Sequence, residues 1–137
     1  MRAIVVDASV AVKWFLNEAE SERAAALLAA GALHAPALLR VEVAAAISRR
    51  QRIGALDEAD ARRLLIEAHA MLRWPAFRFV DDNMLLPRAA EIALQMRHPL
   101  QDCLYVACAE QIGGDVVTVD PKFVARIGPS FSLVKKF

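Results

Sequence analysis

Apolar and polar positions alternate along the chain in blocks that predict strands and helices in turn. The unbroken apolar run at residues 3–6 and the apolar stretch VVTV at 116–119 are typical of strands buried on both faces. Residues 77–80 alternate between apolar and polar side chains, as a half-buried strand does. We expect a short strand or an extended link at 33–36 and a final strand at 131–134.

The remaining apolar positions recur at helical spacing. Helical segments are expected at residues 8–16, 19–30, 37–51, 57–72, 84–97, 99–112 and 121–126. Gly31 ends the second of these segments, and Asp57 caps the fourth. Asp81, Asp82 or Asn83 caps the fifth. Helices between successive strands indicate a parallel sheet that is covered on both faces.

This alternation predicts one α/β domain over residues 1–137. We expect a three-layer α/β/α sandwich whose central, mostly parallel sheet has four or five strands. Ligands of such sheets bind beyond the carboxyl ends of the strands. Asp7 and Asp120 follow directly on two of the apolar runs, so both are expected at that edge.

Composition indicates how the protein packs, where it is located and which partners its charge allows. The 137 residues are 57% hydrophobic but only 7% aromatic, which favours closely packed helices over a large ligand cavity. No apolar run is long enough for a membrane span, and Asp7 and Lys13 interrupt the first apolar stretch too early for a signal peptide. Cys103 and Cys108 are expected to be small buried side chains in a reducing compartment, the cytoplasm. A net charge of +1 neither requires nor excludes a nucleic-acid partner.

Four carboxylates stand in unusual settings. Asp7 and Asp120 each end an apolar strand. Glu42 lies within the apolar helical stretch PALLRVEVAAAI, and Asp102 lies in the first turns of an apolar helix. Helix capping could explain Asp7 and Asp120, and the helix dipole could explain Asp102. Glu42 is harder to explain in this way, because a Glu on an apolar helix face is seldom buried without a partner.

These acids can meet at one edge of the sheet. If the first strand and strand 116–119 are neighbours, Asp7 and Asp120 lie close together. The helix at 99–112, which leads into strand 116–119, then brings Asp102 to the same edge. Carboxylates in one pocket repel each other, so either some stay protonated or a cation neutralises them. Oxygen ligands without His or Cys indicate Mg²⁺ or Mn²⁺, and such sites usually carry out phosphoryl chemistry.

The acids also lie in four ordered motifs that resemble the PIN-domain family, above all its VapC-type toxins. VVDASVAVKWF is similar to the first motif, with Asp7 as the acid and Ser9 as its hydroxyl partner. APALLRVEVAAAISR resembles the second motif, with Glu42 as the acid. One departure is Ala45, where many members have Asn, so a supporting polar contact to the site is in doubt.

The third and fourth motifs follow together in HPLQDCLYVACAEQIGGDVVTVDPKF. Asp102 matches the third acid, and Thr118 and Asp120 match the fourth motif. The resemblance covers nearly the whole chain, and although each motif alone is weak, the four in this order are fairly specific. It implies a PIN-like fold, Mg²⁺-dependent endoribonuclease activity with Mn²⁺ as a substitute, inhibition by a cognate antitoxin, and a homodimer.

The resemblance also implies that the four acids are the metal ligands and the catalytic groups, and that Ser9 and Thr118 support them. Candidate contacts to RNA are Arg40, Lys122 and Arg126. The helices at 37–51 and 57–72 carry stripes of Ala and Leu that one small sheet cannot cover. Part of this surface is expected in a two-fold dimer, and another apolar groove is expected to take an antitoxin peptide.

Other functions share parts of this pattern. A PIN-domain nuclease of RNA processing or DNA repair would carry the same motifs. A phosphatase of the haloacid dehalogenase type would need Asp where Ser9 stands, and a receiver domain would need an adjacent acidic pair at the first strand end. A non-catalytic PIN-like binding module is the remaining alternative. Ala45 favours it, and the presence of all four acids argues against it.

Overall fold

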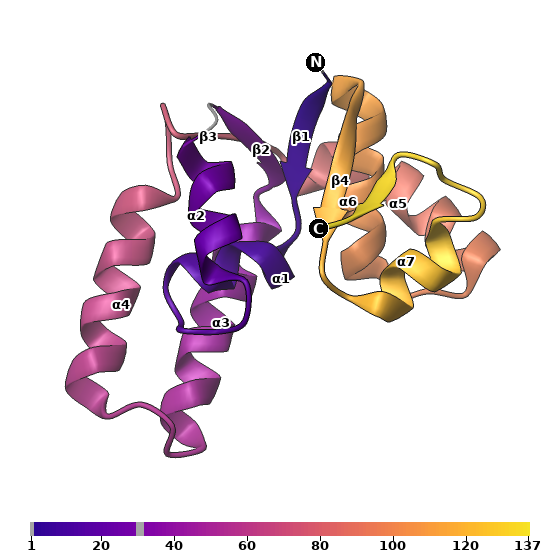
Figure 1. Cartoon of the computed structure of the whole chain (residues 1–137). Coiled ribbons are helices and arrows are strands. Elements are labelled where there is room, and N and C mark those ends of the chain that lie inside the picture. The colour runs from indigo at the N-terminus through magenta and orange to yellow at the C-terminus, as the bar shows by residue number, and fades with distance from the viewer. Residues whose placement is uncertain (1, 30–31) are drawn as a thin grey trace.

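The computed structural model describes residues 2–29 and 32–137, and these residues contain a five-stranded sheet (Figure 1). Its strands are β1 (Ala3–Val6), β2 (Leu33–Pro36), β3 (Phe77–Val80), β4 (Gly114–Thr118) and β5 (Val134–Lys136). Their spatial order is β3-β2-β1-β4-β5, and each neighbouring pair is parallel. The predicted parallel α/β architecture is therefore confirmed. The carboxyl ends of β1 and β4 lie side by side, with Val6 opposite Val117.

Helices connect and cover these strands. They are α1 (Ala8–Ala11), the 3₁₀ turn η1 (Val12–Trp14), α2 (Ser21–Ala29), α3 (Leu38–Arg52), α4 (Glu58–Met71), α5 (Asp82–Met96), α6 (Leu100–Ile112) and α7 (Pro121–Ile127). α6 packs on β1, β2 and β4 with α5 against it, while α1 and α3 also contact the sheet. Figure 1 shows α3 and α4 as two long neighbouring helices that extend beyond the sheet.

The centre of the core is α6, because it is buried on all sides. Cys103 to Ala109 are seven consecutive buried residues, which is typical of a helix that is hydrophobic all round. Val5 and Val6 of β1 are also fully buried. Among the described residues, no helix is both long and apolar enough to cross a bilayer.

Most element boundaries agree with the sequence pattern. Asp57 caps α4 by accepting the N–H of Asp60, and Asp81 caps α5 by accepting the N–H of Asn83. Residue 30 and the expected stop at Gly31 lie outside the described residues.

Three predicted segments differ from the structure. The segment 8–16 forms α1 and a 3₁₀ turn instead of one helix. Strand β4 begins two residues before the predicted start, because Gly114 already pairs with Ala3. The predicted strand at 131–134 is wrong, since β5 runs over Val134–Lys136. The apolar side chains before it belong to a turn in which the N–H of Phe131 bonds to the carbonyl of Ile127.

Candidate active site

Asp7 lies at the carboxyl edge of the sheet, directly after β1. Its N–H donates to the carbonyl of Val117 in β4 at 3.0 Å, so the main chain fixes its position. Its side chain is buried, with 5% of the residue exposed. Ser9 Oγ donates to Asp7 Oδ2 at 2.6 Å, and Thr118 Oγ1 donates to the same oxygen at 2.8 Å. Ser9 is thus the hydroxyl partner of Asp7 that the first motif implied, and Thr118 is a second one.

The two hydroxyls are themselves held by the chain that follows β4. The N–H of Val119 donates to Ser9 Oγ, and the N–H of Asp120 donates to Thr118 Oγ1, both at 3.1 Å. Each hydroxyl therefore accepts one main-chain proton and gives its own proton to Asp7. This arrangement links the ends of β1 and β4 through the Asp7 carboxylate.

Glu42 reaches the site from the first half of α3. It is half-buried, and the hydroxyl of Tyr105 on α6 donates to its Oε1 at 2.6 Å. Tyr105 is fully buried. Ala45, the residue that departs from the second motif, is exposed on α3. The polar contact to Glu42 therefore comes from Tyr105 on α6 and not from a neighbouring residue of α3.

Asp102 lies in the first turn of α6 and is half-buried. Its Oδ2 is 2.7 Å from Nε2 of His98, which is buried just before the helix. Asp120 caps α7, with Oδ1 accepting the N–H of Lys122 at 2.9 Å. The capping role considered for Asp120 is present, and it occupies one of its two oxygens.

The same pattern holds for all four acids. Each has one carboxylate oxygen bonded to the protein, and within residues 2–29 and 32–137 no hydrogen bond reaches the second oxygen. The second oxygens are therefore the atoms that a ligand could use.

The charges of these acids act on one another. Burial raises the pKa of Asp7, and the charge of Asp102 raises it further, against the two hydroxyl bonds that lower it. Burial likewise raises the pKa of Glu42, with Asp7 and Asp102 adding to the effect. Burial also raises the pKa of Asp102, and the charge of Asp120 adds a smaller increase. The fold has thus brought Asp7, Glu42 and Asp102 within electrostatic range of one another, and Asp120 within range of Asp102.

The donor set fits an open site for a hard divalent cation. In the described part of the chain, no group of three or more His, Cys, Asp or Glu side chains lies close enough together to hold a metal ion as a preformed cage. Mg²⁺ does not need such a cage, because it keeps several waters and takes one or two carboxylates from the protein. Carboxylate oxygens with no nearby thiolate match this preference.

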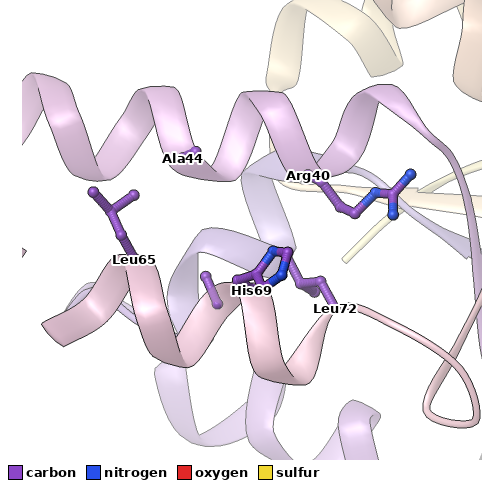
Figure 2. Close-up of a pocket in the computed structure, with 6 residues that line it drawn as sticks. Arg40, Ala44, Leu65, His69 and Leu72 are labelled. Atoms are coloured by element: carbon purple, nitrogen blue, oxygen red, sulfur yellow. The ribbon is translucent and has the colours of Figure 1, made fainter. Parts of the chain in front are cut away.

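An apolar groove lies on the other side of α3. It encloses a cavity of about 200 Å³ between α3 and α4, and Figure 2 shows Arg40 and Ala44 on α3 opposite Leu65, His69 and Leu72 on α4. We call it the α3–α4 groove. The Arg40 guanidinium stacks on Phe79 at the carboxyl end of β3, 4.5 Å from the ring centroid. Arg40 thus lies beside the groove and does not bond to any of the four acids in the described structure.

The two other basic candidates lie on α7. Lys122 lies two residues after Asp120 and is exposed, as is Arg126 one turn later. Arg126 donates to the carbonyl of Arg97 at 3.4 Å.

Sequence reasoning missed three residues at the site. His98 was not assigned to any site, and Tyr105 received no role. Asp82, considered only as a helix cap, raises the pKa of Glu42 and accepts the N–H of Leu38 at 3.1 Å. For Tyr105 the available signal was spacing, because it stands three residues after Asp102 on the same helix. His98 lies before that helix, so helical spacing gave no signal for it.

Comparison with known proteins agrees with this geometry. The PIN domain family model matches residues 4–127, most of the chain. With a parallel sheet of this order and acids at its carboxyl edge, the chain belongs to the PIN-domain family.

Its curated relatives are VapC proteins. Ribonuclease VapC3 of Pyrobaculum aerophilum is 34% identical over 134 residues, which cover 92% of this chain and 98% of the relative. Ribonuclease VapC3 of Mycobacterium tuberculosis is 36% identical over 130 residues, covering 93% and 88%. The resemblance to VapC-type members of the family is confirmed.

Solved structures show the same fold. A toxin–antitoxin complex from Klebsiella pneumoniae matches with a TM-score of 0.66 and 15% identity, covering 97% of this chain and 96% of that chain. A crystal structure of a protein from Pyrobaculum aerophilum matches with a TM-score of 0.66 and 22% identity, covering 98% and 90%.

Proposed function

We propose that this protein is a Mg²⁺-dependent endoribonuclease, the toxin of a type II toxin–antitoxin pair, and that it acts in the cytoplasm. The observation that carries the proposal is the meeting of Asp7, Glu42, Asp102 and Asp120 at one edge of a PIN fold. Relatives that are named ribonucleases and align over most of the chain support it.

In this proposal the four acids hold the cation through oxygens that the protein leaves unbonded. Mg²⁺, or Mn²⁺ in its place, would neutralise charge on the phosphate and make water a better nucleophile. Ser9 and Thr118 hold one oxygen of Asp7, so the other oxygen keeps a fixed direction. Raised pKa values make the half-buried carboxyl groups of Glu42 and Asp102 better proton acceptors than exposed acids.

The cysteines do not offer a competing nucleophile. Burial raises the pKa of Cys103 to about 11 and that of Cys108 to about 12. Both thiols are therefore protonated at neutral pH, and a protonated buried thiol is a poor nucleophile. Hydrolysis by water is the chemistry that the acids support.

RNA would approach over the basic side chains at the rim. Lys122 and Arg126 lie beside Asp120 on α7, and Arg40 lies beside the carboxyl end of β3. Such side chains would pair with phosphates and hold the strand across the acidic edge without reading its sequence.

We also propose two protein partners. The apolar α3–α4 groove suits a peptide of a cognate antitoxin, and a relative in fold was solved as a toxin–antitoxin complex.

A two-fold homodimer would cover exposed apolar side chains on or next to α3 and α4, which are Val41, Ile53 and Ile66. Light scattering on the purified chain tests the dimer, and a monomer at micromolar concentration would contradict it.

The test of activity is cleavage of a panel of structured RNAs by purified protein, with Mg²⁺ or with EDTA. We expect cleavage only with Mg²⁺, complete loss in Asp7→Asn, and a milder loss in Ser9→Ala, which keeps the ligand charge. Glu110→Gln is the matched control, because Glu110 lies on α6 but pairs with Arg88 at the surface. Cleavage that survives EDTA or Asp7→Asn undiminished would refute the proposal. Cleavage of DNA oligonucleotides in preference to RNA would support the repair nuclease instead.

A further inference from the structure

Asp102 stands between two polar ring side chains in the sequence. Tyr105 lies three residues after it on α6, a spacing that places side chains on the same side of a helix, and His98 lies four residues before it, just ahead of the helix. Both rings are buried: 8% of His98 and 0% of Tyr105 is exposed. A core position of this kind is usually apolar, because burying a polar group without a partner is unfavourable.

The side chain of His98 has one hydrogen bond in the described structure, to Asp102. Its Nε2 lies 2.7 Å from Oδ2 of that carboxylate, while its Nδ1 is buried with no partner among the described residues. The tautomer with the proton on Nε2 leaves only a lone pair unpaired at Nδ1. The ring also packs against Phe123, with centroids 5.6 Å apart, so its orientation is fixed. His98 therefore gives a proton to one oxygen of Asp102 from a fixed position.

Tyr105 likewise donates its hydroxyl proton to one oxygen of Glu42 from a fixed position. Its hydroxyl is the only polar atom of the side chain, and it lies 2.6 Å from Oε1 of Glu42 on the neighbouring helix α3. A Glu side chain has three rotatable bonds, so without a partner its carboxylate would sample several orientations. A phenol on a fully buried ring removes this freedom.

We propose that His98 and Tyr105 are positioning residues, which bond one oxygen each of Asp102 and Glu42 and thereby fix the direction of the oxygens that bind the cation. The inference rests on the proposed function, because it assigns a role toward the same ion. It differs from simple core packing in one respect. Packing needs the shape of the two rings, whereas positioning needs their donor protons.

Tyr105→Phe separates shape from the donor proton, because it removes only the hydroxyl. The probe is Mn²⁺ alone, titrated by calorimetry into the full chain without RNA. Partners that orient metal ligands typically contribute 10- to 100-fold in affinity. We expect Tyr105→Phe to weaken Mn²⁺ binding by roughly 10-fold or more, and to raise the Mg²⁺ concentration needed for half-maximal cleavage.

His98→Gln and His98→Asn form a second matched pair. The side-chain amide nitrogen of Gln can reach the position of ring Nε2, whereas that of Asn stops near Nδ1. We expect Gln to restore most of the Mn²⁺ affinity and Asn to lose it. Cys108→Ala controls for general destabilisation of α6, since Cys108 is equally buried on the same helix and bonds to none of the acids.

Melting temperatures in EDTA show whether each variant is folded. Weaker Mn²⁺ binding in the Phe and Asn variants, with wild-type binding in the Gln and Cys108→Ala variants, would support positioning. Equal binding in wild type, Phe and Asn variants would overturn it, as would an equal loss in Cys108→Ala. A wild-type chain that binds no Mn²⁺ would overturn the proposed function as well, so the two failures are distinguishable.

Discussion

Replacing Thr118 by Val tests the hydroxyl pair at the end of β4. Thr118 is fully buried, and Val has nearly the same shape. The change removes the bond to Asp7 Oδ2 and leaves the N–H of Asp120 without its acceptor. A hydrogen bond to a charged group contributes about 1.5–3 kcal/mol, and an unpaired buried N–H costs about 1–3 kcal/mol. Because the Asp120 N–H is only partly buried, we expect the lower part of the summed range, about 3 kcal/mol.

The assay is urea denaturation in EDTA, so that no cation contributes to stability. A loss of about 3 kcal/mol should lower the urea midpoint with an unchanged m-value. In a domain of this size it should lower Tm by roughly 10 °C. Thr118→Ser keeps the hydroxyl and deletes one methyl group, so it should cost only about 1 kcal/mol.

The same argument predicts coupling between Thr118 and Asp7. In an Asp7→Asn background the hydroxyl no longer serves a carboxylate, so the cost of Thr118→Val should fall by at least about 0.5 kcal/mol, as a double-mutant cycle measures. The reasoning is refuted if Thr118→Val is as stable as Thr118→Ser, or if its cost is the same in both backgrounds.

Three further outcomes follow from burial and charge. Because the pKa of Asp7 is raised, the native state binds this proton more tightly than the unfolded chain does, and in EDTA the free energy of unfolding should fall as pH rises through that pKa. Urea titrations at a series of pH values measure this slope, and Asp7→Asn should flatten it. Leu39→Ala in the core should cost about 2–5 kcal/mol, whereas Leu94→Ala, at a residue 83% exposed, should stay within about 0.5 kcal/mol; similar costs at both positions would contradict the fold. Arg40→Ala should weaken RNA binding and reduce the slope of log affinity against log salt by roughly 1 unit if Arg40 contacts a phosphate, and an unchanged slope would exclude that contact.

The sequence predicted the features of the fold that depend on local patterning. An apolar run of four residues located β1 with its observed bounds, because strands buried on both faces need continuous apolar sequence. The stretch LHAP located β2 between two helical segments, also with its observed bounds. The last strand was misplaced for the opposite reason. Phe131 and Leu133 are apolar because they pack from a turn, while β5 itself carries the exposed Lys135 and Lys136 at the sheet edge.

The acidic positions of the site were also visible in the sequence, since an acid after a buried strand or within an apolar helix is unusual. The fold explains their meeting, because β1 and β4 are neighbours and α6 begins at the same edge. The donors His98 and Tyr105 were not recognised, because an aromatic ring in an apolar stretch of sequence is usually a core side chain. The partner of its polar atom is known only from the structure. Tyr105 bonds to a residue 63 positions away, and only tertiary structure reveals such a pair.

The burial of the central part of α6 has a consequence for how the protein tolerates mutation. The helix whose residues Cys103 to Ala109 fill the centre of the core also carries Asp102 and Tyr105. A substitution there that loosens packing also displaces a carboxylate, so selection for folding and selection for chemistry fall on the same buried segment. In a deep mutational scan, Cys103 to Ala109 should be the segment with the lowest tolerance. Variants that keep full abundance in the cell but lose activity should cluster on the Asp102 face of α6, while the remaining buried positions of the helix should lose both together.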